Sequence, residues 1–403
     1  MIINRDIIQR LQNNKGVYAH ILIGPRQCGK STLFSLIGGE KFREVTFDDF
    51  QMRTLAERDP ALFLEQYSPP VIIDEIQYVP NIFPEIKRMI DQLKKDRLLQ
   101  GENSEIKPIF YLTGSNQILL DTQVKETLVG RASYYHLNTL SVHEILSAFP
   151  SLNLTTIIFK GGWPELYTNS SLEPVKYLND YVRNYIEKDI VVSAGIIKKK
   201  EFHTVLGMLA SRTGNILNHS SLAQDSGVKS VTIHEWISVL ERTALLYLLP
   251  PLESNLNKRL TKSPKVYFLD TGLVTRLQGW MDIQPILASP QAGALFETLV
   301  LAEIVKFISN FGRNWKIFLW RTKEGEEVDF IIDNGKGGFL ALDAKLSVHG
   351  ANPEPLPKSL SKTLPLIQHM TLVTYGGKKQ WLSRDCLQLP LSELTSFLLD
   401  WDV

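Results

Sequence analysis

The sequence carries Gly24-Pro-Arg-Gln-Cys-Gly-Lys-Ser31 directly after a short apolar run, Tyr18–Ile23, and before a helical stretch, Lys30–Ile37. Its glycines let the backbone wrap so that successive N–H groups point at phosphate oxygens. Lys30 can neutralise the β and γ phosphates, and the Ser31 hydroxyl can bind Mg²⁺. The stretch therefore predicts a P-loop that holds ATP with Mg²⁺. The residues expected to contact the cofactor are Gly24, Gln27, Cys28, Gly29, Lys30, Ser31 and Thr32.

The region around this loop alternates strand and helix signals. Further short apolar strands are expected at Glu44–Phe47, Val71–Ile73 and Ile109–Leu112, with helical stretches between them. This alternation predicts an α/β domain with a parallel sheet and helices on both faces. Ligands of such sheets gather at the carboxyl ends of the strands, where the polar clusters of this region stand.

Residues at two of these strand ends are suited to ATP hydrolysis. Val71-Ile-Ile-Asp74-Glu75 is a Walker B pattern, in which Asp74 would hold Mg²⁺ through water and Glu75 would polarise the attacking water. Thr113 or Ser115, at the next strand end, can hydrogen-bond the γ-phosphate or the water as a sensor. Arg131 can place a guanidinium on the transition-state charge, in cis or across a subunit interface, or it can be a plain surface arginine.

Four stretches together resemble the prokaryotic AAA+-superfamily ATPases that carry a DEiQ-type Walker B. They are Val71-Ile-Ile-Asp-Glu-Ile-Gln-Tyr-Val-Pro80, Tyr111-Leu-Thr-Gly-Ser115, Leu128-Val-Gly-Arg131 and Gly161-Gly-Trp-Pro164. In that family a conserved domain of unassigned function follows the ATPase, and the resemblance extends to about residue 390. It implies ATP binding, with hydrolysis, and says little about biological role.

Composition limits the class of protein. The 403 residues are 44% hydrophobic and 22% charged, which predicts a globular chain of two or three domains. A formal net charge of +1 gives no global basic field, so a nucleic-acid contact would rest on local patches. Cys28 and Cys386 have neither zinc nor disulfide spacing, and no signal peptide or membrane span is recognisable. We therefore expect a soluble, cytoplasmic protein with no membrane partner.

Three domains are expected: an ATPase domain at 1–165, a middle region at 166–285 and a C-terminal domain at 286–403. In the middle region, a short helix before Gly227, a second helix at Lys229–Leu240 and two strands predict a winged helix-turn-helix. It would meet DNA through the start of the second helix and through a basic wing, or serve instead as a lid or protein-contact module. The residues expected at DNA are Lys229, Ser230, Thr232, His234, Arg259, Lys262 and Lys265.

The C-terminal domain carries an acidic constellation on predicted strands. Asp329, followed by Asp343-Ala-Lys345 on a neighbouring strand, is the layout of the PD-(D/E)xK, restriction-endonuclease-like fold. Asp329 and Asp343 would meet around Mg²⁺, Glu297 would complete that site from a helix, and Lys345 would activate the water. Asp343 stands where the pattern more often has Glu, and no Pro precedes Asp329.

Two hypotheses follow from these regions. In the first, the protein is an ATP-driven enzyme that acts on DNA, with Mg²⁺-dependent nuclease activity in its C-terminal domain. In the second, it is an ATP-dependent switch whose C-terminal domain only binds a partner or DNA. Self-association through the ATPase domain is compatible with both hypotheses.

Overall fold

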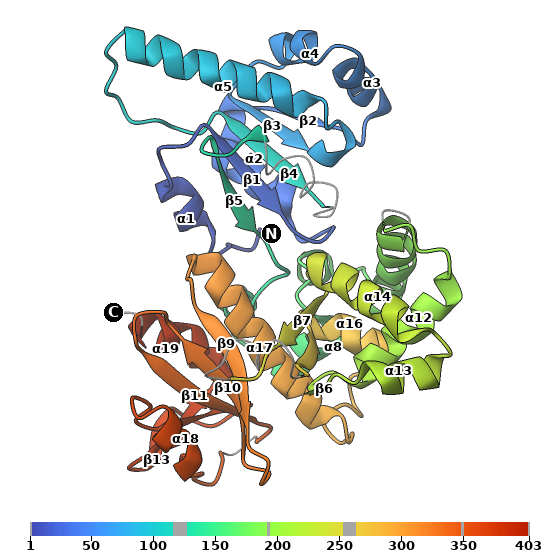
Figure 1. Cartoon of the computed structure of the whole chain (residues 1–403), viewed down its shortest axis with the longest axis vertical. Coiled ribbons are helices and arrows are strands. Elements are labelled where there is room, and N and C mark those ends of the chain that lie inside the picture. The colour runs from blue at the N-terminus through green and yellow to red at the C-terminus, as the bar shows by residue number, and fades with distance from the viewer. Residues whose placement is uncertain (1, 116–126, 192–193, 253–262, 348–349, 402–403) are drawn as a thin grey trace. The chain divides into compact units, whose positions relative to one another are not determined.

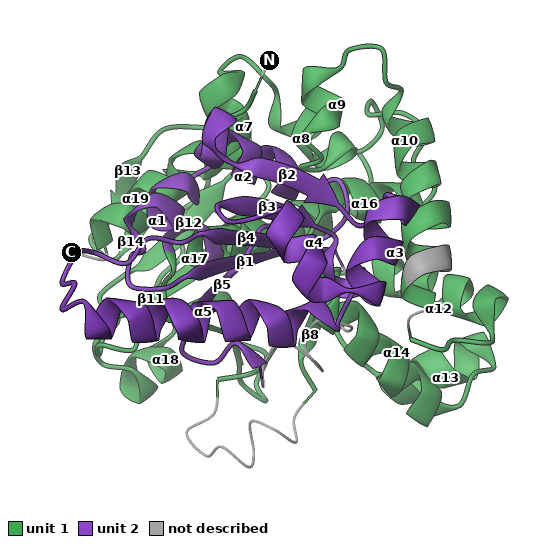
Figure 2. Ribbon diagram, turned by 90° about the horizontal axis from the view of Figure 1, so that it is seen from above, with its two compact units in different colours: residues 1–4, 139–308, 312–403 green, residues 5–138, 309–311 purple. Residues whose placement is uncertain are grey.

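The chain folds into two units, which Figure 2 colours separately. The N-terminal unit comprises residues 5–138 and 309–311, and the C-terminal unit comprises residues 1–4, 139–308 and 312–403. The computed structural model describes residues 2–115, 127–191, 194–252, 263–347 and 350–401. The expected wing residues Arg259 and Lys262 lie outside the described residues.

A five-stranded sheet organises the N-terminal unit, and all its strands run parallel in the order β2-β3-β4-β1-β5 (Figure 1). The predicted parallel α/β architecture is therefore confirmed. The strands are β1 (Ala19–Ile23), β2 (Arg43–Thr46), β3 (Val71–Asp74), β4 (Phe110–Gly114) and β5 (Ala132–His136). The helices are α1 (Ile8–Asn13), α2 (Lys30–Gly38), α3 (Phe50–Arg58), α4 (Pro60–Gln66), η2 (Ile76–Tyr78) and α5 (Ile82–Leu99).

Helices cover both faces of this sheet because successive strand residues point to opposite sides. Ile21, Ile73 and Leu112 pack in one core cluster with residues of α3, α4 and α5. Their neighbours Leu22 and Ile72 pack in a second cluster with residues of α1 and α2. The three central strands β1, β3 and β4 are thus buried on both faces. Polar side chains stand at or just after their carboxyl ends.

The first half of the C-terminal unit is mainly helical and includes a small sheet of order β6-β8-β7. Consecutive helices α13 and α14 contact each other and precede two antiparallel strands, β7 and β8. The helices are α7 (Val142–Ala148), α8 (Leu154–Lys160), α9 (Glu165–Thr168), α10 (Pro174–Tyr181), η3 (Val182–Ile190), α12 (Lys199–Ser211), α13 (His219–Ser226), α14 (Ser230–Arg242) and α16 (Thr271–Leu277). The strands are β6 (Asn215–Ile216), β7 (Leu246–Leu249) and β8 (Lys265–Phe268).

Asp270, which directly precedes α16, explains the glycines of the Gly161-Gly-Trp-Pro164 motif. Its carboxylate accepts hydrogen bonds from the amide of Gly162 (2.9 Å) and the hydroxyl of Thr139 (2.8 Å). It also caps α16 through the amides of Gly272 and Leu273. A Cβ at position 161 would overlap this carboxylate, so glycine is required there. The motif therefore joins α8 to α16 and has a structural role.

A six-stranded mixed sheet of order β13-β14-β12-β11-β10-β9 forms the second half of the C-terminal unit. β10 pairs antiparallel with both β9 and β11, whereas β11, β12 and β14 are parallel. The strands are β9 (Lys316–Arg321), β10 (Glu327–Asp333), β11 (Phe339–Lys345), β12 (Met370–Thr374), β13 (Gln380–Ser383) and β14 (Cys386–Pro390). The helices are α17 (Ala292–Phe311), whose last residues belong to the N-terminal unit, α18 (Lys358–Thr363) and α19 (Leu394–Trp401).

Candidate functional site

The predicted P-loop leaves β1 and enters α2, as its chemistry requires. Gln27 and Gly29 both have left-handed backbone conformations, with φ of 62° and 96°. Gly24 is needed for a different reason, because a Cβ there would overlap the carbonyl oxygen of Leu137. One glycine therefore permits the turn, and the other permits close contact with the end of β5.

The loop presents donors to an anion. Among the described residues, the main-chain N–H groups of Cys28 and Lys30 face the Cys28 sulfur, whereas no acceptor is found for those of Gln27, Gly29, Ser31 and Thr32. They include the first N–H groups of α2, where a helix has unsatisfied donors and the positive end of its dipole. Lys30 is buried, and its Nζ donates to the carbonyl oxygens of Gly24 and Pro25, both at 3.0 Å. The ammonium group therefore lies within the loop that would surround the phosphates.

Arg5 is a buried residue of this site that the sequence did not reveal. Its guanidinium donates to the carbonyl oxygens of Cys28 (2.8 Å) and Asn138 (2.7 Å), and thereby ties the loop to the end of β5. The Cys28 thiol is also buried and donates to the Leu137 carbonyl oxygen at 3.4 Å. Burial raises the pKa of this thiol. Cys28 can therefore serve a nucleotide through its main chain, while its side chain packs inward.

The Walker B carboxylates meet the polar end of β4. The Thr113 hydroxyl donates to Asp74 and lies 3.3 Å from the amide nitrogen of Glu75. Ser115 donates to Oε2 of Glu75 from its hydroxyl (2.5 Å) and from its amide (3.4 Å). Glu75 is 7% exposed and has a left-handed φ of 54°. The structure thus brings Asp74, Glu75 and Ser115 together, as the strand order predicts.

Gln77 is a further member of this group, and only the resemblance to DEiQ-type ATPases singled out its position. It lies on η2, is 5% exposed, and donates from Nε2 to Oε2 of Glu75. The same nitrogen is 3.3 Å from the Ser115 hydroxyl. A buried amide that contacts both residues belongs to the candidate hydrolysis site.

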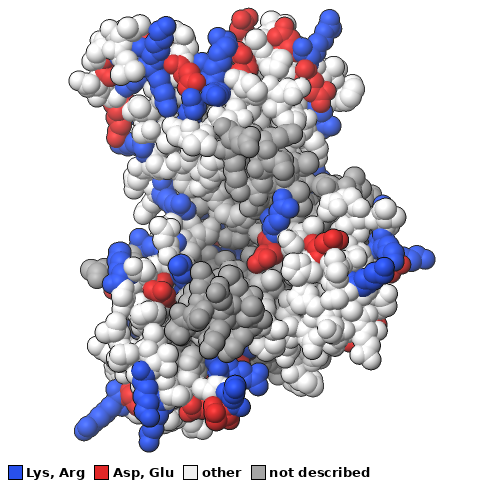
Figure 3. All heavy atoms as spheres, viewed as in Figure 1, with Lys and Arg blue, Asp and Glu red and all other residues white. Residues whose placement is uncertain are grey.

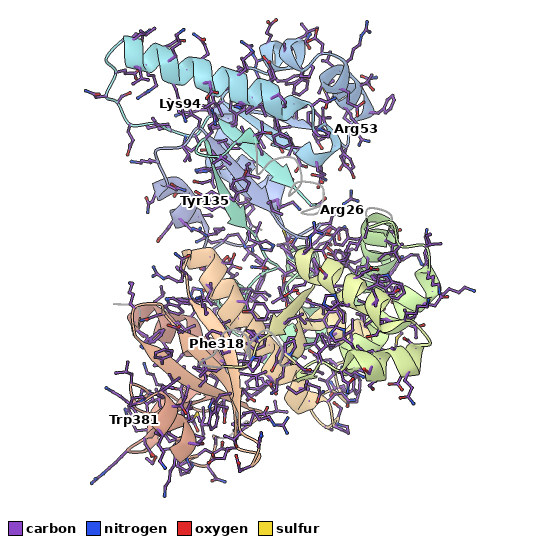
Figure 4. All side chains as sticks on the ribbon, viewed as in Figure 1. Arg26, Arg53, Lys94, Tyr135, Phe318 and Trp381 are labelled. Carbon is purple, nitrogen blue, oxygen red and sulfur yellow. The ribbon has the colours of Figure 1, made fainter. Side chains whose placement is uncertain are left out.

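Charged and aromatic side chains surround the loop. Arg26 of the P-loop donates to the Tyr78 hydroxyl at 2.8 Å, and the Arg53 guanidinium lies 4.1 Å from the Tyr78 ring centroid (Figure 4). Partial burial and the carboxylate of Glu75 raise the pKa of Asp48, at the end of β2. Burial and the positive charge of Lys30 lower the pKa of His136 to about 4, so this imidazole is neutral at pH 7.

Arg131 lies at the amino ends of the parallel strands, whereas the P-loop lies at their carboxyl ends. Its main chain pairs with Tyr18, so Gly24 is six residues away along a parallel strand, roughly 20 Å at 3.3 Å per residue. Its guanidinium forms a two-point ion pair with Asp91 (2.7 and 2.8 Å). That pairing holds the pKa of Asp91 below its usual range. Arg131 therefore does not reach the phosphate site of its own unit, and a role in cis does not fit this arrangement.

The predicted C-terminal acids gather around a lysine that sequence reasoning assigned elsewhere. Lys265, expected at DNA phosphates, has a side chain only 6% exposed. Its Nζ lies 2.9 Å from Glu297, 2.7 Å from Glu327 and 3.5 Å from Asp329. The Tyr267 hydroxyl also donates to Glu297. The expected DNA contact of Lys265 is therefore wrong, because its ammonium is buried among carboxylates.

The carboxylates of Asp329 and Asp343 also accept main-chain hydrogen bonds. Asp343 accepts from the amide of Asp329 (2.9 Å), and Asp329 accepts from the amide of Ala344 (3.0 Å). Lys345 lies 3.7 Å from Asp343 and 2.9 Å from Glu354. Burial and Asp329 raise the pKa of Asp343 to about 7.

The described residues contain no set of three His, Cys, Asp or Glu side chains placed to hold a metal ion. The Lys265 ammonium, which Glu297 and Asp329 share, does not fit the Mg²⁺ site expected of Glu297, Asp329 and Asp343. The activation of a water by Lys345 stays a prediction.

Replacement of Lys265 by Met should destabilise the C-terminal unit by about 3–5 kcal/mol, because buried carboxylates lose their counter-charge. Hydrogen exchange of the β10 amides measures this loss locally. Lys316→Met is the matched control, since Lys316 is an exposed lysine on β9 of the same sheet. This control should cost no more than about 1 kcal/mol. Equal protection of β10 in the two variants would contradict the proposed importance of the Lys265 network.

Three family models match consecutive stretches of the sequence. Residues 17–146 match a family model described as an AAA domain. Residues 151–284 and 292–394 match domains of unknown function, DUF8612 and DUF4143. Uncharacterized proteins of Mycobacterium tuberculosis and Mycobacterium bovis are each 28% identical over 316 residues, which cover 78% of this chain and 67% of theirs.

Two solved structures show slight similarity to this chain. The RuvB Holliday junction branch migration motor of Thermotoga maritima has a TM-score of 0.30 at 17% identity, covering 64% of this chain and 95% of that one. The ORC2 protein of Aeropyrum pernix, solved in ADPNP-ADP complexes, has a TM-score of 0.31 at 14% identity, covering 70% and 92%. Both TM-scores are well below the range of a shared fold. By sequence, residues 17–146 are thus similar to an AAA domain, and residues 292–394 are similar to the DUF4143 domain of unknown function.

Proposed function

We propose that this protein binds ATP with Mg²⁺ and hydrolyses it in the N-terminal unit. The observation that carries the proposal is the grouping of a P-loop, two Walker B carboxylates and the polar end of β4 at one edge of a parallel sheet. The match of residues 17–146 to an AAA domain supports it. Each group needed for phosphoryl transfer to water has a side chain of suitable chemistry at this edge.

The chemistry follows from these positions. Main-chain N–H groups of the loop and the Lys30 ammonium hold the phosphates and offset their charge. The oxygen of the attacking water bonds to the γ-phosphorus while Glu75 accepts a proton from that water. The bond between the γ-phosphorus and the leaving ADP oxygen breaks. Ser115 fixes the orientation of the Glu75 carboxylate.

The residues present fit a magnesium ion. Mg²⁺ prefers oxygen ligands and keeps several waters, and Ser31 and Asp74 supply a hydroxyl and a carboxylate next to the loop. Thr113 orients Asp74 through a hydrogen bond, as partners of metal ligands commonly do. When bound, the ion would neutralise charge on the β and γ phosphates.

Phosphate release from ATP, with and without metal, tests this function. We expect purified protein to release phosphate with excess Mg²⁺ and to lose at least about 10²-fold in rate when EDTA removes the metal. Binding of a fluorescent ATP analogue, measured in parallel, separates binding from hydrolysis. Release that is undiminished in EDTA, or a failure to bind the analogue, would contradict the proposal.

The role of the C-terminal unit distinguishes the two hypotheses. The Lys265 network favours an ATP-dependent switch over a nuclease, because its carboxylates do not fit a metal site. A DNA contact through a winged helix-turn-helix remains a proposal, supported by the order of α13, α14, β7 and β8. It would rest on exposed residues at the start of α14 such as Lys229 and Ser230. On the face seen in Figure 3, however, charges of both signs are interspersed among the described residues.

No helix in the described part of the chain has the length and apolar content needed to cross a bilayer. Cytoplasmic location and self-association through the ATPase domain remain predictions. The same holds for a role of Arg131 across a subunit interface.

A further inference from the structure

Gln77 is the one buried amide that contacts both Glu75 and Ser115 among the described residues. Its orientation follows from charge: only the NH₂ end can face the Glu75 carboxylate, because the reverse orientation would place oxygen against oxygen. The amide oxygen Oε1 of Gln77 is therefore not the atom that meets Oε2 of Glu75. It is buried, and no described residue donates a hydrogen bond to it.

A buried carbonyl oxygen without a hydrogen-bond donor is unfavourable because it has lost its contact with water, so such an atom requires a specific explanation. A water molecule supplied with the substrate would give this oxygen its missing donor. The position is suitable because Gln77 lies on η2, two residues after Glu75, and its side chain contacts the Glu75 carboxylate.

The two oxygens of the Glu75 carboxylate also differ in their hydrogen-bond donors. Its Oε2 accepts from Gln77 and twice from Ser115. No donor to its Oε1 is found in the part of the chain that the structure describes. One carboxylate oxygen is thus fixed by donors, and the other is left to accept from water.

We propose that Gln77 is a catalytic residue of ATP hydrolysis, whose Oε1 and the free Oε1 of Glu75 together orient the attacking water. A water that donates both protons to two acceptors turns a lone pair toward the γ-phosphorus. Its oxygen then bonds to phosphorus, one proton passes to Glu75, and the bond to the ADP oxygen breaks. This proposal rests on the proposed ATPase function.

The test replaces Gln77 by Met, which keeps side-chain length but removes both the donor and the acceptor. We expect kcat to fall by about 10²-fold, with KM and analogue binding within about twofold of wild type. Gln92→Leu is the control, because Gln92 is exposed on α5 and contacts only Asp96 among described residues. This control should keep wild-type turnover.

A double-mutant cycle separates a shared catalytic role from loss of structure. If Gln77 and Glu75 act on one water, Gln77→Met should reduce single-turnover hydrolysis far less in the Glu75→Gln background than in wild type. Additive losses, or wild-type kcat in Gln77→Met, would overturn this inference while leaving the proposed ATPase function intact. Absence of ATP turnover in the wild type would instead contradict the proposed function itself.

Discussion

Replacement of Glu75 by Gln should reduce ATP turnover by about 10²- to 10⁴-fold, the range expected for removal of a general base. The variant keeps the size of the side chain and an oxygen that can accept from Ser115, so the site should keep its shape. ATP should bind within about twofold of wild-type affinity, because Glu75 contacts neither the loop main chain nor Lys30 in the structure. Phosphate release and binding of a fluorescent ATP analogue measure the two properties separately.

Glu57→Gln is the matched control for this variant. Glu57 is an exposed residue of α3 in the same unit, so loss of its charge should leave turnover unchanged. Wild-type turnover in Glu75→Gln would mean that the Walker B assignment is wrong. A loss of analogue binding in Glu75→Gln would show instead that the carboxylate supports the nucleotide pocket.

Replacement of Lys30 by Ala should weaken ATP binding by about 3 kcal/mol, roughly 10²-fold. The ammonium is buried within the loop and donates to two loop carbonyl oxygens, so it would meet the phosphates without a large rearrangement. Its loss removes a charge-assisted hydrogen bond from a site with little access to solvent. Titration with the fluorescent analogue measures the change.

Folding and charge controls make the Lys30 result interpretable. Lys41→Ala removes an exposed lysine of the same unit and should leave affinity unchanged. Circular dichroism should show that Lys30→Ala stays folded, since two loop hydrogen bonds are worth only about 2 kcal/mol together. Wild-type affinity in Lys30→Ala would contradict the assignment of the P-loop.

The parallel sheet could be predicted from its short apolar runs, and the phosphate site from the polar residues that follow them. Gly24, Asp74 and Ser115 each follow an apolar run, and parallel strands bring their carboxyl ends to one edge. β5 was not predicted, because Ala132–His136 mixes small, aromatic and polar residues without an apolar run. Because β5 could not be predicted, the sequence did not indicate that Arg131 lies at the amino end of a strand.

Other residues depend on contacts that no local pattern contains. Arg5 reaches the carbonyl oxygen of Asn138, 133 residues later, and an isolated arginine near the N-terminus gives no sign of this. Lys265 follows other basic residues and was therefore assigned to the wing. Its partners Glu297 and Asp329 come 32 and 64 residues later, on elements that only the folded C-terminal unit brings together.

The identity of the nucleotide retained under single-turnover conditions tests the central claim most directly. Wild-type protein and Glu75→Gln would be mixed in excess with radiolabelled ATP and Mg²⁺, captured on a filter, and their bound nucleotide resolved. The account predicts ADP on the wild type and intact ATP on Glu75→Gln, because the P-loop binds in both and only the wild type has its base. Capture of no nucleotide by either protein, or ADP formed at the wild-type rate on Glu75→Gln, would contradict it.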